Sequence, residues 1–451
     1  MITHDAVRVL VANWDGTYTV PSRRLYPHQW SWDSAFIAIG NARWSPRRAR
    51  TELLTLFGAQ WQDGRVPHIV FNPAVPEGAY FPGPRFWGVR APSGVATSGI
   101  VQPPVHALAA WKIHQAEPDV AFLRRIYPRL VAQQRFLRGE RRSPEGLISI
   151  VHPWESGMDN SPAWDLPLQA VEATGSAGGI GAVRRDLGHV SAAERPTDRD
   201  YERYVALAAA YRDSGYRDPG SFQVEDPLFN AAYGVAESVL AEIARVCGHD
   251  PEPHEREAVR VTAAMVEHLY DDGLFHARDV RTGCLIRSSS AAGLTPLLLP
   301  GLPREIVNTL VGTALDRFGL KDGVLPSYSP AAPGFEPGRY WRGPKWINLS
   351  WLVWQGLRER RPDLAAPLAD GMIAAVGASG FREYFDPITL DGHGSRDFSW
   401  SAALIVDVVA EHAGGIVAEH GLEGVPAAGR QVGEQAGRVG EIGDVGDEVL
   451  A

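Results

Sequence analysis

The feature that most constrains the fold is the helical spacing of apolar residues along almost the whole chain. Apolar side chains recur three and four residues apart in one segment after another, whereas strand signals are weak and short. In the segment 47–61, for example, Leu53, Leu54 and Phe57 share one helix face. About 12 helices meet this criterion, and they are joined by loops of very unequal length. The pattern predicts an all-α chain with its chemistry in the loops.

The predicted helices leave few ways to close a core. Besides 47–61, they cover the ranges 7–14, 102–114, 119–138, a segment ending near 212, 226–246, 255–270, 303–318, 344–358, 362–376 and 398–412. One hairpin is expected over 274–286. No tandem repeat is visible, which disfavours a solenoid. One closed solution is a six-hairpin toroid, the (α/α)6 barrel, with six inner and six outer helices and the long loops gathered over one end.

Composition narrows the class of partner. A net charge of −9 argues against nucleic acid and acidic membranes, because both need a concentrated positive patch. Only Cys247 and Cys284 are present, without a Cys-x-x-Cys pair, so we expect no disulfide framework, metal site or cofactor. No long apolar run or leader is visible, which predicts a cytoplasmic protein without a membrane span. A small-molecule partner is favoured, and a homo-oligomer is left open.

Two glycine-rich segments are read as non-catalytic. The sequence GSAGGIG at 175–181 lacks the Gly-Lys-Ser/Thr of a phosphate loop and follows no apolar strand, so we reject phosphate binding there. Beyond residue 412 the composition shifts to Gly, Val, Ala and Glu, without aromatic residues. We therefore predict a single catalytic domain over 1–412 and a poorly ordered tail over 413–451.

The stretch 147–165, LISIVHPWESGMDNSPAWD, sets three carboxylates among tryptophans and prolines. A carboxyl group in an aromatic pocket loses hydration and its pKa rises, which suits a proton donor. Trp154 and Trp164 offer apolar faces of the kind that pack against sugars. The alternative is a structural loop whose Asp and Asn residues cap turns. Spacing alone leaves Glu155, Asp159 and Asp165 as rivals for the acid.

Three other segments combine acids with aromatic groups. The sequence FREYFDP at 381–387 places Glu383 between helices, where a structural ion pair is the competing interpretation. Trp30, Ser31, Trp32 and Asp33 stand at the mouth of a helix, and 339–348 offers Arg, Tyr, Trp and Asn groups. Two carboxylates in separate aromatic loops, with no nucleophile triad, indicate glycoside hydrolysis by an acid and a base.

These motifs carry a resemblance to a known family. They include YPHQWSWDSAFIAIG, QWQDGRVPHIVFNP, YFPGPRFW, TSGIVQPPVHA, HPWESGMDNSPAWD, SFQVEDPLFNA, RYWRGPKW and FREYFDP, in order over 20–410. The chain resembles the bacterial mannosylglycerate and glucosylglycerate hydrolases of glycoside hydrolase family 63. The resemblance implies an (α/α)6 barrel, an inverting mechanism and a sugar-glycerate substrate, namely 2-O-α-mannosyl-D-glycerate, 2-O-α-glucosyl-D-glycerate or both.

The resemblance also assigns roles by position. It implies that Asp159, in Gly-Met-Asp-Asn, is the general acid and that Glu383 is the general base. The implied sugar and glycerate contacts are Tyr26, Trp30, Ser31, Trp32, Asp33, Tyr80, Gln102, Gly157, Arg195, Tyr201, Tyr340 and Trp341. Arg195 suits the glycerate carboxylate because its planar fork binds two oxygens. An inverting reaction further predicts that the two carboxyl groups lie about 6.5 to 9.5 Å apart.

Other functions remain open at this stage. A neutral α-glucosidase or trehalase-like enzyme of the same fold would have no need of Arg195 and its tyrosines. A non-catalytic carbohydrate-binding protein would not need both acids, and a scaffold for partner proteins finds support only in the tail. Lys345 and a contracted 175–190 region depart from the family pattern and are expected to affect substrate preference.

Overall fold

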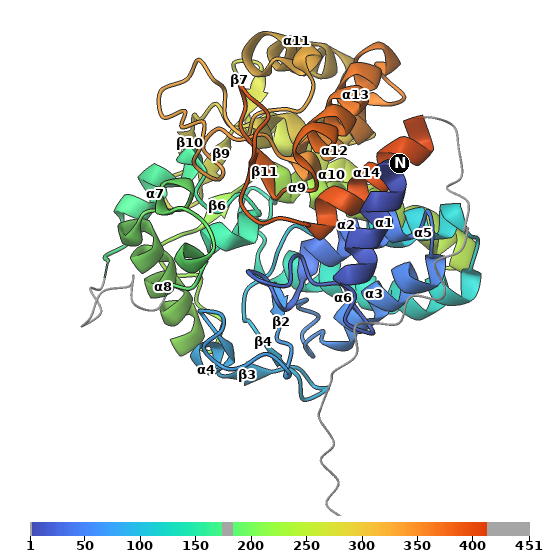
Figure 1. Ribbon diagram of the computed structural model, residues 1–451, viewed down its shortest axis with the longest axis vertical. Helices are drawn as coiled ribbons and strands as arrows, with labels where there is room; N and C mark the ends of the chain where they lie inside the picture. The colour runs from blue at the N-terminus through green and yellow to red at the C-terminus, as the bar shows by residue number, and fades with distance from the viewer. Residues whose placement is uncertain (1, 174–183, 413–451) are drawn as a thin grey trace, which may run out of the picture.

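The computed structural model describes residues 2–173 and 184–412 (Figure 1). The predictions for 175–181 and for the tail after 412 therefore lie outside the described residues. In the described part, twelve α-helices have at least 11 residues. They are α1 (Ile2–Ala12), α2 (Ser31–Asn41), α3 (Pro46–Gly58), α5 (His106–Ala116), α6 (Val120–Glu140), α8 (Asp198–Asp213), α9 (Pro227–Cys247), α10 (Glu252–His268), α11 (Arg304–Phe318), α12 (Ile347–Leu357), α13 (Pro362–Ser379) and α14 (Ser399–His412). The helix-rich character expected from the sequence is confirmed.

Six elements pack against one another in a closed order. Helix α2 packs on α5, α5 on α9, α9 on the 3-10 helix η6 (Ala291–Leu298), η6 on α12, α12 on α14, and α14 again on α2. A second set lies against these six. Helix α3 packs on α2, α6 on α9, α10 on α9, α11 on η6, α13 on both α12 and α14, and α1 on α14. Figure 1 shows α1, α2 and α14 side by side although they come from opposite ends of the described chain.

Two helices of the first set, α2 and α12, are buried on all or nearly all sides. Every residue of α2 is buried, and α12 is buried from Ile347 to Trp354. Helices that are apolar on all sides belong inside a packed core. The contact between α2 and α14 is especially close, because a Cβ built on Gly40 would lie 2.2 Å from the carbonyl oxygen of Ala403. No helix in the described residues combines the length and apolarity needed to cross a membrane.

Short strands tie the loops to the helices. They are β1 (Gln29–Trp30), β2 (Ile69–Val70), β3 (Val89–Arg90), β4 (Ala96–Thr97), β5 (Ser149–Ile150), β6 (Val224–Glu225), β7 (Tyr270–Asp271), β8 (Leu274–Phe275), β9 (Ala277–Asp279), β10 (Leu285–Ile286), β11 (Tyr384–Phe385) and β12 (Gly392–His393). They form antiparallel sheets of order β1-β2-β4-β3, β10-β9-β6-β5, β11-β12 and β7-β8. Their registers include Trp30 opposite Ile69, Ile150 opposite Val224 and Tyr384 opposite His393.

The structure corrects the sequence-based elements in a few places. The helix expected from residue 102 begins at His106, since a residue that precedes proline avoids the α-region and 103–104 is Pro-Pro. The helix expected from residue 344 begins at Ile347, because Lys345 instead exchanges backbone hydrogen bonds of 2.8 and 3.0 Å with Phe385. The predicted hairpin is confirmed only as β9 and β10, since β8 pairs with β7. The short helices α4 (Pro84–Trp87) and α7 (Asp165–Gln169) and the small sheets are additions.

Candidate active site

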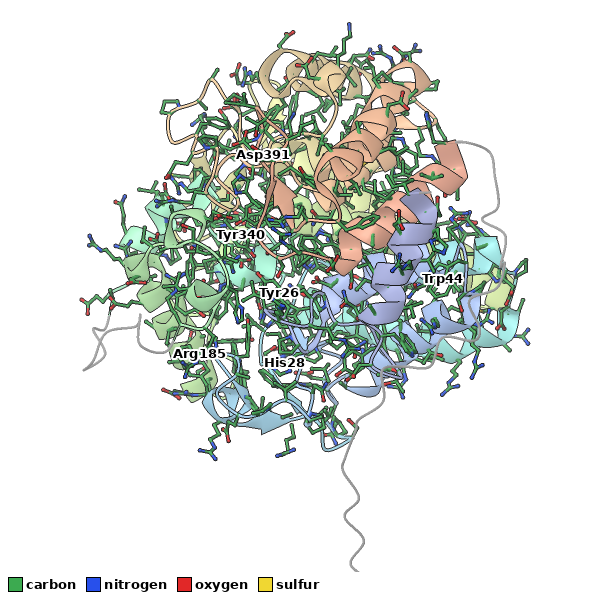
Figure 2. All side chains as sticks on the ribbon, in the orientation of Figure 1. Tyr26, His28, Trp44, Arg185, Tyr340 and Asp391 are labelled. Carbon is green, nitrogen blue, oxygen red and sulfur yellow. The ribbon has the colours of Figure 1, made fainter. Side chains whose placement is uncertain are left out.

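One cavity gathers side chains from segments that are far apart in the chain. It is lined by both candidate catalytic carboxylates, Asp159 and Glu383, and by the predicted binding residues Tyr26, Trp30, Trp32, Asp33, Tyr80, Gln102, Gly157, Arg195, Tyr201, Tyr340 and Trp341. The space between these side chains, including its opening to solvent, is about 870 Å³. In Figure 2, Tyr26 and Tyr340 lie near the centre of the view.

Strand β1 and the first turn of α2 supply one wall. Pairing of Trp30 with Ile69, together with a 3.0 Å hydrogen bond from the Ser31 amide to the His68 carbonyl, fixes the start of the helix. Trp32 and Asp33 then face the cavity. Burial raises the pKa of Asp33 well above its usual range, which favours a neutral carboxyl group that can donate a hydrogen bond.

Ser31 is the one predicted binding residue that does not line the cavity. Its hydroxyl lies 3.1 Å from Nε2 of His106, on α5, and its side chain is buried. Successive helical residues point about 100° apart, so a residue between two cavity-facing tryptophans is turned toward the neighbouring helix. The structure thus places the Ser31 hydroxyl away from the cavity, and its contact with a ligand stays a prediction.

The loop that carries Asp159 is held by its backbone. Trp164 donates from Nε1 to the Met158 carbonyl at 2.8 Å, and Tyr204 donates to the Asp159 carbonyl at 3.0 Å. Gly157 has φ +74°, and a Cβ there would lie 2.4 Å from the Trp32 ring. A side chain at this position would be both strained and in conflict with that ring, so glycine lets the loop approach the cavity.

The Asp159 carboxyl group itself is left without a side-chain partner. Within the described residues, no side chain donates a hydrogen bond to it. Burial, opposed by the charge of Arg195 and reinforced by that of Glu383, raises the pKa of Asp159 to about 7. A carboxyl group with this pKa is substantially protonated at neutral pH and can deliver the proton to a leaving group.

Its two neighbours in the stretch have different surroundings. Glu155 is fully buried and accepts hydrogen bonds of 2.8 and 2.9 Å from Arg141, along with backbone amides, so it is a structural ion pair. Asp165 is half exposed and is bound by both terminal nitrogens of Arg342, at 2.8 and 2.9 Å. Neither lines the cavity, which separates Asp159 from its rivals.

Glu383 precedes β11 and is held by three groups. Tyr26 donates to its Oε1 at 2.8 Å, the Ser395 amide donates to its Oε2 at 2.9 Å, and Nη1 of Arg195 lies 3.6 Å from Oε1. Burial raises the pKa of Glu383, while Arg195, Ser395 and Tyr26 oppose the shift. These donors stabilise the ionised form, so this carboxylate is suited to accept a proton.

Arg195 lies between Glu383 and a second carboxylate, Asp186. Its Nε donates to Asp186 at 3.2 Å, and its guanidinium carbon lies 4.1 Å from the centre of the Tyr340 ring. Tyr340 has φ +40°, a backbone conformation that non-glycine residues rarely adopt. A 3.0 Å hydrogen bond from Trp346 to its carbonyl helps to hold it there. The strained tyrosine thus provides the surface on which the guanidinium lies.

Aromatic rings form the remaining walls. Trp341 stacks on Trp346 with ring centres 3.6 Å apart, and Trp30 meets Tyr26 and Tyr80 edge to face at 5.3 Å each. Such flat apolar faces beside polar groups match the mixed surface of a sugar.

The remaining predicted binding residues also serve as structural contacts. Gln102 accepts a 3.1 Å hydrogen bond from the Trp32 amide, and Tyr201 donates to the Phe81 carbonyl at 2.8 Å. Both side chains therefore connect the cavity to the loops around it.

Some outcomes differ from the sequence-based expectations. Trp154 lines the cavity, whereas Trp164 is buried behind the loop and holds its backbone. Lys345 is also outside the lining, because its backbone pairs with β11. Sequence reasoning missed six charged or aromatic lining residues: His68, Phe81, Arg185, Asp186, Phe398 and Trp400. His68 and Trp400 stand inside motifs or predicted elements given above, but Asp186 had no sequence signal.

Comparisons with known proteins agree with this arrangement. A family model described as "Mannosylglycerate hydrolase MGH1-like glycoside hydrolase domain" matches residues 26–401. The mannosylglycerate hydrolase of Thermus thermophilus is 43% identical over 88% of this chain and 98% of its own length. The glucosylglycerate hydrolase of Mycolicibacterium hassiacum is 38% identical over 89% of this chain and 96% of its own length.

A solved structure extends the similarity to three dimensions. The crystal structure of a family 63 mannosylglycerate hydrolase from Thermus thermophilus, in complex with Tris and D-glycerate, matches with a TM-score of 0.84 and 42% identity. The match covers 90% of this chain and 99% of that one. The chain therefore belongs to the family of mannosylglycerate hydrolase MGH1-like glycoside hydrolases, within glycoside hydrolase family 63.

Proposed function

We propose that the protein is an inverting α-glycoside hydrolase that cleaves 2-O-α-mannosyl-D-glycerate, 2-O-α-glucosyl-D-glycerate or both to the free sugar and D-glycerate. The observation that carries this proposal is the pair of carboxyl groups at one cavity with opposite hydrogen-bond environments. Asp159 lacks a side-chain donor among the described residues and has a pKa near 7, whereas Glu383 receives donors that favour its ionised form. The two are thus poised as acid and base.

The reaction is a single displacement. Glu383 accepts a proton from a water molecule as that water attacks the anomeric carbon. The bond from the anomeric carbon to the glycerate oxygen breaks, and Asp159 gives its proton to that oxygen. Attack on the face opposite the leaving group converts the α-linkage into a β-anomer. Room for the water requires carboxyl groups about 6.5 to 9.5 Å apart, whereas about 5 Å would indicate retention.

Arg195 is proposed to bind the glycerate carboxylate. It is buried, its Nη1 has no hydrogen-bond partner among the described residues, and it lines the cavity beside Glu383. A buried, always-charged fork matches a carboxylate better than a neutral hydroxyl group does. The D-glycerate in the complex of the Thermus relative supports an acidic product in this family.

The fold proposal goes with the function. We propose that the closed order of α2, α5, α9, η6, α12 and α14, with a second set of helices packed against it, is an (α/α)6 barrel. We further propose that residues 1–412 are one catalytic domain. Residues at the start and end of the described chain, including Tyr26 and Glu383, share one cavity, which supports a single unit.

The test is sugar release from mannosylglycerate, glucosylglycerate and trehalose by purified protein, with the product anomer followed by NMR. Release of the β-anomer from a glycerate conjugate supports the acid, the base and the arginine together. Release of the α-anomer overturns the inverting mechanism. Activity on trehalose alone favours the second candidate, a neutral α-glucosidase or trehalase-like enzyme, and removes the glycerate role of Arg195. No hydrolysis, with retained sugar binding, favours a non-catalytic carbohydrate-binding protein.

A further inference from the structure

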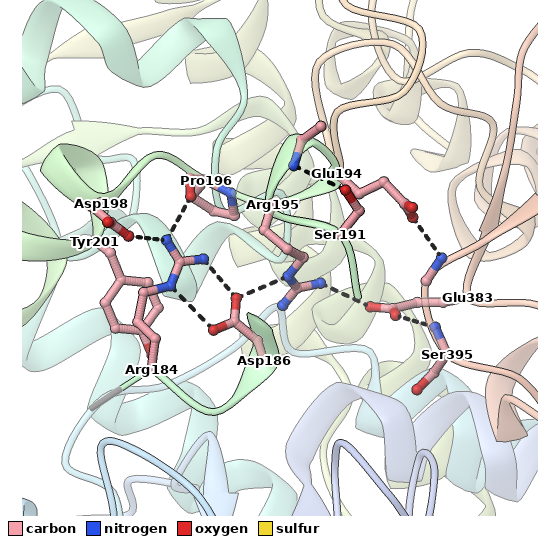
Figure 3. Close-up of polar contacts among 12 residues, drawn as sticks. Arg184, Asp186, Ser191, Glu194, Arg195, Pro196, Asp198, Tyr201, Glu383 and Ser395 are labelled. Carbon is pink, nitrogen blue, oxygen red and sulfur yellow. Dashed lines mark hydrogen bonds and ion pairs between the residues drawn. The ribbon is translucent and has the colours of Figure 1, made fainter. Parts of the chain in front are cut away.

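A chain of alternating charges leads from the protein surface to Glu383 (Figure 3). Arg184 binds Asp186 through two nitrogens, at 2.7 and 3.1 Å, and reaches the exposed Asp198 at 2.9 Å. Asp186 in turn accepts the 3.2 Å hydrogen bond from Nε of Arg195. The last link, from Arg195 to Glu383, is the longest, at 3.6 Å, and is an ion pair without a hydrogen bond.

Two carboxylates therefore compete for one guanidinium. Asp186 and Glu383 are both nearly buried, with side chains 10% and 1% exposed, so water screens neither attraction well. Although burial raises it, the hydrogen bond from Arg184 and the charge of Arg195 bring the pKa of Asp186 below its usual value. Asp186 is thus charged at neutral pH and holds the Nε side of Arg195.

We propose that Asp186 is a positioning residue that keeps Arg195 from forming a direct hydrogen-bonded ion pair with Glu383. The inference rests on the proposed function, because it assigns Glu383 as the base and Arg195 as the carboxylate ligand. Held by Asp186, the arginine leaves its buried Nη1, which has no hydrogen-bond partner among the described residues, for the substrate carboxylate. Without Asp186, Arg195 would bind Glu383 directly. This ion pair would make Glu383 a weaker base, and Nη1 of Arg195 would no longer be available to the substrate carboxylate.

Other groups near Glu383 do not replace Asp186 in this role. The ionisable groups that face it are Tyr26, Asp33, Asp159, Glu194, Arg195, Tyr340 and Tyr384. Arg195 is the only cation among these described residues, so its position determines how strongly a positive charge stabilises the ionised form of Glu383. Glu194 accepts a 3.2 Å hydrogen bond from the Gly394 amide and lies 3.3 Å from His393, and so it holds the loop beside the base, not the arginine.

The test is the substitution Asp186→Asn, which keeps the size of the side chain but removes its charge. We expect kcat/KM on the glycerate conjugate to fall roughly tenfold to a hundredfold. Because Arg195 moves toward Glu383 and lowers its pKa, the acid limb of the kcat/KM profile shifts to lower pH. KM for the glycerate conjugate rises more than KM for a neutral α-glycoside. Asp198→Asn is the matched control, since Asp198 pairs with Arg184 but is 60% exposed and does not contact Arg195.

A double-mutant cycle separates positioning from a structural role. In an Arg195→Ala background, Asp186→Asn should have almost no further effect on kcat or KM, because Asp186 acts through the missing arginine. Asp186→Glu retains the charge and should retain the acid limb of the parent. If the losses of the two single variants add in the double variant, the proposal is overturned. It is also overturned if Asp186→Asn leaves both KM and the acid limb of the kcat/KM profile unchanged.

A binding measurement separates this inference from the proposed function. Calorimetric titration with D-glycerate needs no turnover, and we expect Asp186→Asn to weaken binding about tenfold relative to Asp198→Asn. If the parent protein hydrolyses no glycoside, the proposed function fails while this comparison still stands. If the parent hydrolyses the conjugate and both variants bind D-glycerate equally, the positioning role alone is wrong.

Discussion

The loop that carries Asp159 and the loop that carries Glu383 present the same functional group to one cavity in different surroundings. The Asp159 loop is fixed through its backbone, by Trp164 and Tyr204, and leaves the carboxyl group free of side-chain donors among the described residues. The Glu383 loop is fixed through the carboxylate itself, by Tyr26 and the Ser395 amide. Burial raises the pKa of both, so the hydrogen-bond donors decide which of the two holds its proton.

The largest expected effect comes from removing each group in turn. Asp159→Asn and Glu383→Gln should each lower kcat on the glycerate conjugate roughly 10³-fold or more. An α-glycosyl fluoride discriminates between them, since fluoride leaves without a proton donor. On this substrate the Asp159→Asn variant should regain most of the activity that it loses on the glycerate conjugate, whereas the Glu383→Gln variant should not. Equal losses on both substrates would contradict the assignment of acid and base, and circular dichroism controls for the fold.

Arg195 is expected to matter next, and mainly for acidic substrates. Arg195→Ala removes a buried charge-assisted contact, so kcat/KM for a glycerate conjugate should fall about 10²- to 10³-fold. A neutral α-glycoside of the same sugar should lose less, mainly through the altered field at Glu383. Steady-state kinetics on both substrates measure the difference. An equal loss on the two would count against a carboxylate ligand.

The pH profile of the unmodified protein tests the same contrast. Asp159 must be protonated to act, so kcat/KM should fall about tenfold per pH unit above its pKa, which is near 7. Glu383 must be ionised, so activity should also fall as the pH drops through its pKa, which burial keeps above the usual value. A profile that stays flat to about pH 9 would show that no group with such a pKa acts as the acid.

A substitution at Tyr26 changes the hydrogen-bond environment of Glu383 by removing one oxygen atom. Tyr26→Phe removes the 2.8 Å hydrogen bond to Glu383 and keeps the ring. Because that bond lowers the pKa of Glu383, its loss should shift the acid limb of kcat/KM upward and reduce kcat about tenfold. The shift is opposite to the one expected for Asp186→Asn. Two shifts of the same sign would refute this account of the base.

The smallest effect is expected at Asp165, in the same stretch as Asp159. Asp165→Asn weakens the pair between the half-exposed Asp165 and Arg342 outside the cavity, and Arg342 keeps its second partner, Glu336. Surface pairs contribute about 1 kcal/mol or less, so kcat/KM should stay within about twofold of the parent and the melting temperature should change little. A loss comparable to that of Asp159→Asn would reopen the choice of acid.

The helices and most of the cavity residues were predicted from the sequence, but for different reasons. Helical periodicity is repeated over many residues, so segments such as α9 and α13 were predicted within a few residues of their ends. The two-residue strands carry no periodicity that can be recognised, and their pairing depends on distant segments. The cavity residues were found because the motifs around them resemble a family, and the lining reproduces that set except for Ser31.

What the sequence could not supply is how side chains act through one another. Nothing in the local pattern distinguishes Glu155, which binds Arg141, from Asp159, since both are acids in one aromatic stretch. Asp186 is a single acid after two arginines, and its role depends on the distance from Arg195 to Glu383. Such roles are set by tertiary geometry and burial, which spacing along the chain does not encode.

The contact of α14 with α1 and α2 has a consequence for how the molecule is made. The hydrogen bond from Tyr26 to Glu383 joins residues 357 positions apart, so the cavity belongs to the contacts of highest sequence separation. Such contacts form slowly, because a long loop must close before they contribute. During synthesis, the apolar face of α2 stays uncovered until α14 has emerged from the ribosome. The cavity can therefore form only after α14 has been made, and until then the apolar surface that α14 covers is exposed and prone to aggregation.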